Sequence, residues 1–142
     1  MANFTMTGLD EMLADMTRKG QRSGQIAIAM CNIGAGIIKD EWVQVATEHG
    51  FIDTGEMIAS IGFPAPVTNM GSFLYRDIYP QGKDSKGVRN AEKAFILHYG
   101  SSKLSASYWV DEADNKAVPK VESALQEAWY KFCEDGTIPT TV

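Results

Sequence analysis

The chain has 142 residues, 44% of them hydrophobic and 22% charged, and its formal net charge at pH 7 is −5. A chain of this length and composition forms one domain, spanning residues 1–142, whose core needs no disulfide or metal to hold it together. Its 13 Lys and Arg residues are scattered along the sequence, so sequence-specific binding to nucleic acid is not expected.

The cysteines and the apolar stretches are typical of a soluble protein made in the cytoplasm. Cys31 and Cys133 are far apart in sequence and have no neighbouring Cys or His that would form a redox or metal motif. We expect both thiols to be reduced and half-buried. The longest apolar stretch, residues 26–38, contains Asn32 and two glycines and is shorter than the roughly 20 residues that cross a bilayer. The first residues show no leader pattern, and no membrane contact is expected.

Hydrophobic periodicity predicts two helices in the N-terminal third. The first is short and carries four apolar residues on one face: Leu9, Met12, Leu13 and Met16. After a polar break at residues 20–24, a long helix is expected over about residues 25–48, and Gly50 ends it. Gly34 and Gly36 each cost this helix about 1 kcal/mol relative to Ala. They indicate either close approach of another element or subunit, or a local kink.

The middle of the chain predicts a β-hairpin. Residues 51–61 form a loop and then a short helix or turn, with Asp53 or Thr54 as its cap. Residues 61–67 alternate apolar and small residues, but Pro64 and Pro66 restrict them to an edge strand. Residues 69–71 signal a turn, and residues 72–79 form the best strand. One hairpin is not stable alone, so it must lie against helices or a neighbouring chain.

The C-terminal half predicts three helices. After a polar loop at residues 81–87, Asn90 is expected to cap a helix over residues 91–99 that Gly100 ends. Ser107 is expected to cap a second short helix, and Pro119 fits the first turn of the last one, which ends near Gly136. The predicted fold class is α+β, with a long N-terminal helix and C-terminal helices packed on a small, mainly antiparallel sheet.

The residues offer no recognisable catalytic, cofactor or metal site. No Gly-x-Ser-x-Gly, Cys-x-x-Cys, His-x-x-x-His or calcium-loop pattern occurs. The acidic pairs Asp40–Glu41 and Asp111–Glu112 are adjacent in sequence, so their carboxylates diverge on a helix. We interpret His98 as a half-buried side chain. The alternative is a small cytoplasmic enzyme or ligand-binding domain that uses His98 in a pocket.

The aromatic residues near the C-terminus allow two interpretations. Trp129 and Phe132 are expected in the core, where they would hold the last helices together. Tyr108 and Trp109 suit either a core or a contact between protein surfaces, because aromatic side chains are frequent anchors in interfaces.

Two segments resemble one known family. Residues 51–61 (FIDTGEMIASI) resemble the "D-T-G, three or four residues, S-I" stretch of the bacteriophage tail-component and head–tail joining family, the type I neck proteins. Residues 95–103 (FILHYGSSK) are similar to its "aromatic-Gly-Thr/Ser-Ser/Thr-Lys" stretch, which an aromatic pair and a long C-terminal helix follow. The residues that carry the resemblance are Asp53, Thr54, Gly55, Ser60, Ile61, Tyr99, Gly100 and Ser101. The chain departs at Ser107, where the family usually has a proline, and in the two prolines of the hairpin.

The resemblance implies a non-enzymatic structural protein of a bacteriophage virion, without cofactors. Identical subunits would form a sixfold ring at the head-proximal end of the viral tail or neck, complete the tail and join it to the head connector. Its partners would be further copies of itself, the head connector and the tail tube proteins, and DNA would pass through without sequence-specific binding. A tail terminator or minor tail protein is the alternative within this class.

Contacts between subunits are expected at the hairpin, in the polar loop and at the aromatic pair, because an unpaired hairpin edge is a natural site for another chain to add. The expected contact residues are Phe63, Phe73, Tyr75, Tyr79, Lys83, Arg89, Tyr108 and Trp109.

Overall fold

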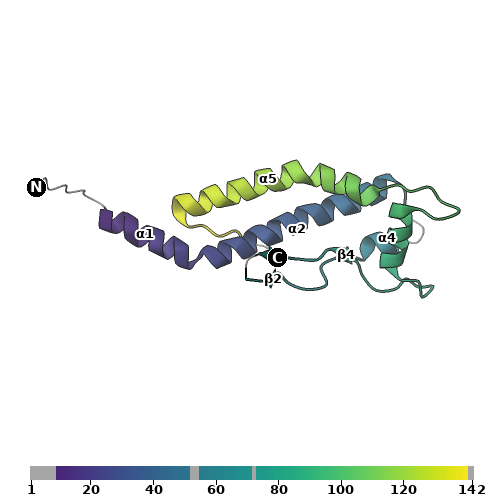
Figure 1. The fold of residues 1–142 in the computed structure, drawn as a ribbon, viewed down its shortest axis with the longest axis horizontal. Coiled ribbons are helices and arrows are strands. Elements are labelled where there is room, and N and C mark those ends of the chain that lie inside the picture. The colour runs from purple at the N-terminus through teal and green to yellow at the C-terminus, as the bar shows by residue number, and fades with distance from the viewer. Residues whose placement is uncertain (1–8, 52–54, 72, 141–142) are drawn as a thin grey trace, which may run out of the picture.

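The computed structural model describes residues 9–51, 55–71 and 73–140, and Figure 1 shows an elongated molecule built along two long helices. The described elements are α1 (Leu9–Gln21), α2 (Ser23–Glu48), α3 (Glu56–Ala59), β1 (Ile61–Gly62), β2 (Thr68–Asn69), β3 (Leu74–Tyr75), β4 (Tyr79–Pro80), α4 (Asn90–Tyr99) and α5 (Trp109–Asp135). The α+β fold class predicted from the sequence is confirmed.

Helices α2 and α5 lie side by side and antiparallel, and each is about 40 Å long (Figure 1). Small buried residues along the contact let the two helices approach each other. A Cβ added to Gly34 would lie 3.5 Å from Val121 of α5, whereas one added to Gly36 would meet nothing within 4 Å. Of the two explanations for these glycines, close approach of another element therefore applies to Gly34.

The main core lies where α3 and α4 pack against the C-terminal end of α2 and the start of α5. Trp109 is at its centre and is completely buried, with its ring 5.6 Å from Trp42 and 6.2 Å from Phe51. Its indole N–H donates to the carbonyl of Ala94 at 3.3 Å. The other buried members of this cluster are Val45, Ala46, Met57, Ile61, Ala94 and Ala113.

The expected hairpin forms, but as two short antiparallel ladders. Near its base Ile61 pairs with Pro80, and near its tip Thr68 pairs with Tyr75. The residues between β1 and β2 include two prolines, which lack the N–H that a ladder needs. The predicted turn at residues 69–71 is confirmed, because the N–H of Gly71 donates to the side chain of Asn69 at 2.8 Å.

The C-terminal helices differ from the prediction. One helix, α5, replaces the two that were expected, and Pro119 lies inside it. Residues on both sides of the proline, among them Ala113 and Phe132, are buried, so packing holds the helix together where propensity would break it. The burial of Phe132 is confirmed. The predicted burial of Trp129 is wrong, because this residue is 44% exposed.

Two predicted capping residues serve other purposes. Asn90 lies inside the first turn of α4, and its side chain donates to the carbonyl of Gln81 at 2.9 Å. The hydroxyl of Ser107 donates to the carbonyl of Leu97 at 2.5 Å. Both side chains act as donors that tie a loop to its neighbour, and neither α4 nor α5 has a side-chain cap on its first N–H groups.

The N-terminal helix extends past the paired helices (Figure 1). The predicted polar break shrinks to one residue, Arg22, whose guanidinium donates to the carbonyl of Gly136 at 2.8 Å. The apolar residues Met12, Leu13 and Met16 on α1 are about half exposed. Helix α1 is thus held at its C-terminal end, and its apolar face has little to pack on within the described chain.

The two cysteines differ in burial. Cys31 is half-buried, as predicted, and burial raises the pKa of its thiol. Cys133 is exposed on α5, so that part of the prediction is wrong. Both are free thiols. No helix in the described residues is long and apolar enough to span a membrane.

Candidate functional site

The loop between β4 and α4 is a tightly hydrogen-bonded turn that displays basic side chains. One carboxylate oxygen of Asp84 accepts the backbone N–H groups of Lys86 and Val88, both at 2.9 Å. The N–H of Asp84 in turn donates to the carbonyl of Val88 at 2.8 Å. Lys83, Lys86 and Arg89 are exposed around this frame.

Asp84 is buried and forms an ion pair with Lys93 of α4. The hydrogen bond from Lys93, helped by the backbone N–H groups of Val88 and Lys86, lowers the pKa of the Asp84 carboxyl. Asp84 therefore remains ionised at neutral pH, and the pair fixes the loop to the first turns of α4.

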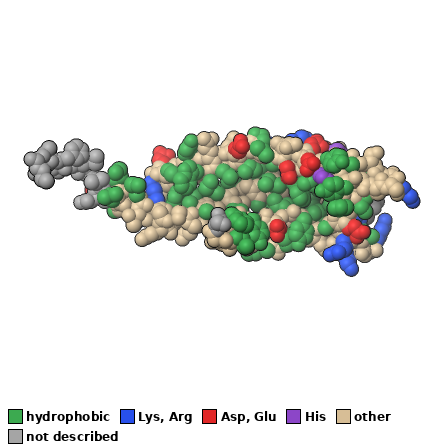
Figure 2. All heavy atoms as spheres, viewed as in Figure 1, with side chains coloured by type: hydrophobic (Ala, Val, Ile, Leu, Met, Phe, Trp, Pro, Cys, Tyr) green, Lys and Arg blue, Asp and Glu red, His purple; other side chains and the backbone are tan. Residues whose placement is uncertain are grey.

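The outer face of α4 carries an exposed apolar surface. Phe95, Ile96 and Tyr99 all point away from the core, and the rings of Phe95 and Tyr99 are 4.7 Å apart. Lys103 lies in the loop that follows α4, while Lys83 lies in the loop that precedes it. Figure 2 shows Lys and Arg side chains gathered at this end of the molecule. We name this surface the basic tip: it consists of Lys83, Lys86, Arg89, Lys103, Phe95, Ile96 and Tyr99.

A strained turn brings Tyr108 to the same end. Tyr108 has φ of 51°, and among the described residues it is the one non-glycine in the left-handed region. Its N–H donates to the carbonyl of His98 at 3.0 Å, which holds the strained backbone in place. The ring is half exposed and lies 5.4 Å from the ring of His98.

The hairpin displays further aromatic side chains. Phe73, Tyr75 and Tyr79 are exposed, and the rings of Phe73 and Tyr75 are 6.1 Å apart. Phe63 is half-buried, with the guanidinium of Arg76 3.9 Å from its ring centre. The half-buried Phe63 offers little surface to another chain.

A groove of about 400 Å³ lies between α2, α5 and residues 76–78. Its floor is apolar, and its charged lining residues are three carboxylates, Asp77, Asp114 and Glu122, together with the guanidinium of Arg76. Asp114 accepts a hydrogen bond from the indole N–H of Trp42 at 2.8 Å. We name this feature the acidic groove; its apolar lining residues are Ile38, Trp42, Ile78, Ala117, Val118 and Val121.

His98 is buried between α4 and the start of α5 rather than half-buried as expected. Its Nδ1 accepts the N–H of Val110 at 3.3 Å, and its Nε2 lies 3.9 Å from the Asp111 carboxylate. In the described part of the chain it forms no hydrogen bond with a serine or cysteine. Among these residues, no group of three or more His, Cys, Asp or Glu side chains could hold a metal ion.

The motif residues lie at turns around the core. Gly55, with φ of 77°, precedes α3, and Gly100, with φ of 83°, ends α4. The Ser60 hydroxyl donates to the carbonyl of Met57 at 2.7 Å, and Ile61 is buried. The Ser101 hydroxyl accepts the N–H of Lys103 at 3.2 Å. Asp53 and Thr54 lie outside the described residues.

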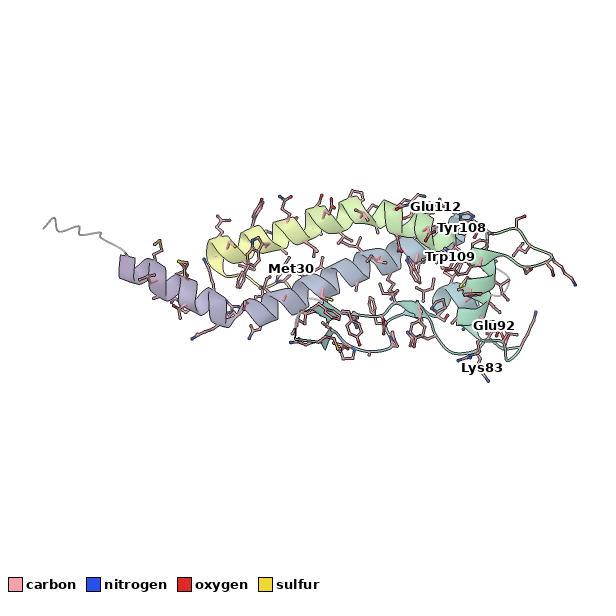
Figure 3. The ribbon with its side chains drawn as sticks, viewed as in Figure 1. Met30, Lys83, Glu92, Tyr108, Trp109 and Glu112 are labelled. Atoms are coloured by element: carbon pink, nitrogen blue, oxygen red, sulfur yellow. The ribbon has the colours of Figure 1, made fainter. Side chains whose placement is uncertain are left out.

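The prediction of a subunit contact is wrong for one residue. Trp109 is completely buried in the core, so it cannot touch a neighbouring subunit, whereas Tyr108 next to it is half exposed (Figure 3). The left-handed turn at Tyr108 separates the two side chains, and sequence periodicity does not reveal such a turn. The sequence analysis also did not identify Phe95 and Ile96 as exposed. Ala94 and His98 are four residues apart and both buried, so they mark the inner face of α4 and place Phe95 and Ile96 outside it.

Comparison of the chain with protein-family models, with characterised protein sequences and with solved structures found no match.

Proposed function

We propose that this protein is a non-enzymatic structural subunit of a tailed-bacteriophage particle. It forms a ring at the head-proximal end of the tail, completes the tail and joins it to the head connector. The resemblance of residues 51–61 and 95–103 to type I neck proteins suggests this role, and a tail terminator is the nearest alternative.

The observation that carries the proposal is the distribution of exposed apolar side chains. They occur in several separate places, among them α1 with Met16, the hairpin end with Phe73, α4 with Phe95 and the C-terminal part of α5 with Trp129. Exposed apolar surface of this extent usually marks contacts with other proteins. A subunit that meets like neighbours as well as a head and a tail partner needs several such surfaces.

The charge of the chain also supports the proposal. With a net charge of −5, the protein as a whole repels a DNA backbone, which suits a ring that DNA crosses without being retained. The role needs no cofactor and no reactive group, and His98, the side chain on which a rival enzyme would depend, already accepts a backbone hydrogen bond.

The test is electron microscopy of particles from a phage that carries a stop codon at Trp42. We expect DNA-filled heads beside detached tails, and a suppressor host should restore joined particles. Tails of irregular length would favour the terminator, because a terminator stops tail polymerisation. Intact infectious particles in normal number would contradict any structural role in the tail.

A further inference from the structure

We propose that the basic tip of one copy docks head-to-tail in the acidic groove of a second copy. The inference rests on the proposed function and deepens it, because it names the two surfaces through which a ring would close.

The basic tip has the composition of an interface anchor. It offers two aromatic rings and an isoleucine on one exposed helix face, flanked by cationic side chains that outnumber one exposed carboxylate, that of Glu92 (Figure 3). In the described chain Lys83, Arg89 and Lys103 form no ion pair, so their charges are available to a partner. Aromatic residues at a patch centre with charged residues at the rim are the usual arrangement of a binding surface.

The acidic groove matches the tip in both apolar surface and charge. Its three carboxylates outnumber its one cation, Arg76, whose guanidinium already donates to the Asn32 side chain and to the carbonyl of Ala65. Its floor is apolar, and Trp42 and Val118 from the two long helices contribute to it. Asp77 and Glu122 are exposed at the groove and, within the described residues, form no ion pair. An apolar side chain from the tip would fill the floor while its basic neighbours meet these carboxylates.

The second copy is favoured as occupant because both halves of the contact lie on this one chain. The tip surrounds α4 at the end of the molecule, whereas the groove lies along the paired helices, so one copy cannot fill its own groove with its own tip. Contact between two different surfaces of identical chains is heterologous, and it produces rings when the rotation closes. Nucleic acid would suit the tip alone and would be repelled by the groove.

The test uses charge reversal on the purified full chain. The tip-reversed variant carries Lys83→Glu and Arg89→Glu, and the groove-reversed variant carries Asp77→Lys and Glu122→Lys. A control with the same change in net charge as the tip variant carries Arg18→Glu and Lys131→Glu, both exposed and on other parts of the surface. Circular dichroism checks that each variant is folded, and sedimentation equilibrium measures self-association up to about 1 mM chain, where weak contacts are populated.

We expect the wild type and the control to associate, and each reversed variant alone to associate at least about tenfold more weakly. Mixing the two reversed variants should restore association, because each then offers a surface of the opposite charge to the other. Association of the wild type should weaken as salt screens the exposed charges.

Three results would overturn the proposal: a wild type that stays monomeric at about 1 mM, a tip-reversed variant that associates like the wild type, or a mixture that fails to recover. A tip-dependent shift of duplex DNA without self-association would identify nucleic acid as the occupant instead.

These solution results do not depend on the phage experiment. Joined particles lost at the Trp42 stop codon, together with a failed mixing test, would keep the tail role and remove only the tip–groove contact.

Discussion

At the scale of single residues, Trp109 is the side chain on which the core depends most. It is fully buried among residues from α2, α4 and α5, and its indole N–H is satisfied by Ala94. Replacing Trp109 with Ala should lower the free energy of unfolding by about 3–5 kcal/mol, because it leaves a large cavity. Trp129→Ala, at an exposed position, is the control and should cost about 1 kcal/mol. Urea unfolding measures both, and equal losses would contradict this account.

Two glycines should respond to alanine with opposite signs. A Cβ on Gly100 would lie 2.7 Å from the Leu104 carbonyl oxygen and 2.7 Å from the Ala106 nitrogen, at φ of 83°. Gly100→Ala should therefore cost at least about 2 kcal/mol. Gly36 lies in a helix with open space around it, so Gly36→Ala should stabilise by about 0.5–1 kcal/mol. Thermal unfolding of the two variants should show Tm shifts in opposite directions.

Asp84 makes the loop before α4 sensitive to acid. Because its pKa is lowered in the folded chain, mainly by Lys93, its ion pair stabilises fully above the unfolded pKa of about 4. As the pH falls below that value, Asp84 becomes protonated in the unfolded chain first, and the stabilisation decreases. The loss is complete when Asp84 of the folded chain is protonated too. The amides of Lys86 and Val88 should lose protection from hydrogen exchange in this range.

The matched test compares unfolding free energies between pH 5 and pH 2.5 for Asp84→Asn and for Asp40→Asn. Asp84→Asn should flatten the pH dependence, because the amide has no proton to gain. Asp40→Asn is the control, because it makes the same chemical change at an exposed carboxylate that forms no ion pair within the described residues. If the unfolding free energy of the Asp84→Asn variant changed with pH as steeply as that of the wild type, the ion pair between Asp84 and Lys93 would not stabilise the loop.

At the scale of elements, α5 shows packing overriding a local signal. Pro119 interrupts the backbone hydrogen bonds of the helix, yet Ala117 before it and Ala128 after it are buried against α2. Pro119 itself is exposed, so Pro119→Ala should remove the interruption without opening a cavity and should stabilise by about 1–3 kcal/mol.

The control for this change is Pro64→Ala in the unpaired part of the hairpin, where no helix is interrupted. That substitution should be neutral or slightly destabilising, because the unfolded chain gains freedom. Guanidinium unfolding compares the two. Destabilisation by Pro119→Ala would mean that α5 needs a bend at this point in order to follow α2.

At the scale of the whole molecule, the two long helices and the projecting α1 produce an elongated particle (Figure 1). A compact domain of this length has a radius of gyration of about 14–15 Å. Small-angle X-ray scattering of dilute protein should give a larger value, and a variant that lacks residues 1–17 should give a smaller one while remaining folded. A value of about 14 Å for the full chain would mean that α1 folds back on the body.

The same elongation separates the proposed interaction surfaces. The basic tip lies at the α4 end, whereas the exposed methionines of α1 lie at the other end. A subunit with unlike ends and an acidic groove between them suits directional assembly, in which each copy meets its neighbours through different surfaces.

The sequence by itself determined the features that depend on neighbours a few residues away. The periodicity of residues 25–48, the turn at residues 69–71, and the helix ends at Gly50 and Gly136 were all predicted, because backbone geometry at these positions depends on local residue types. The α+β class followed from the same local patterns.

The tertiary structure alone decided which aromatic residues are buried and which elements are continuous. The sequence favoured the core for Trp129 and left Trp109 open between core and interface, yet Trp109 is buried and Trp129 is exposed. The reason is that α4 and the strained turn at Tyr108 cover Trp109, whereas nothing in the described chain covers Trp129. The acidic groove brings together residues from α2, the hairpin and α5 that are tens of positions apart. Burial and continuity at these places depend on contacts between distant segments, and no local pattern carries that information.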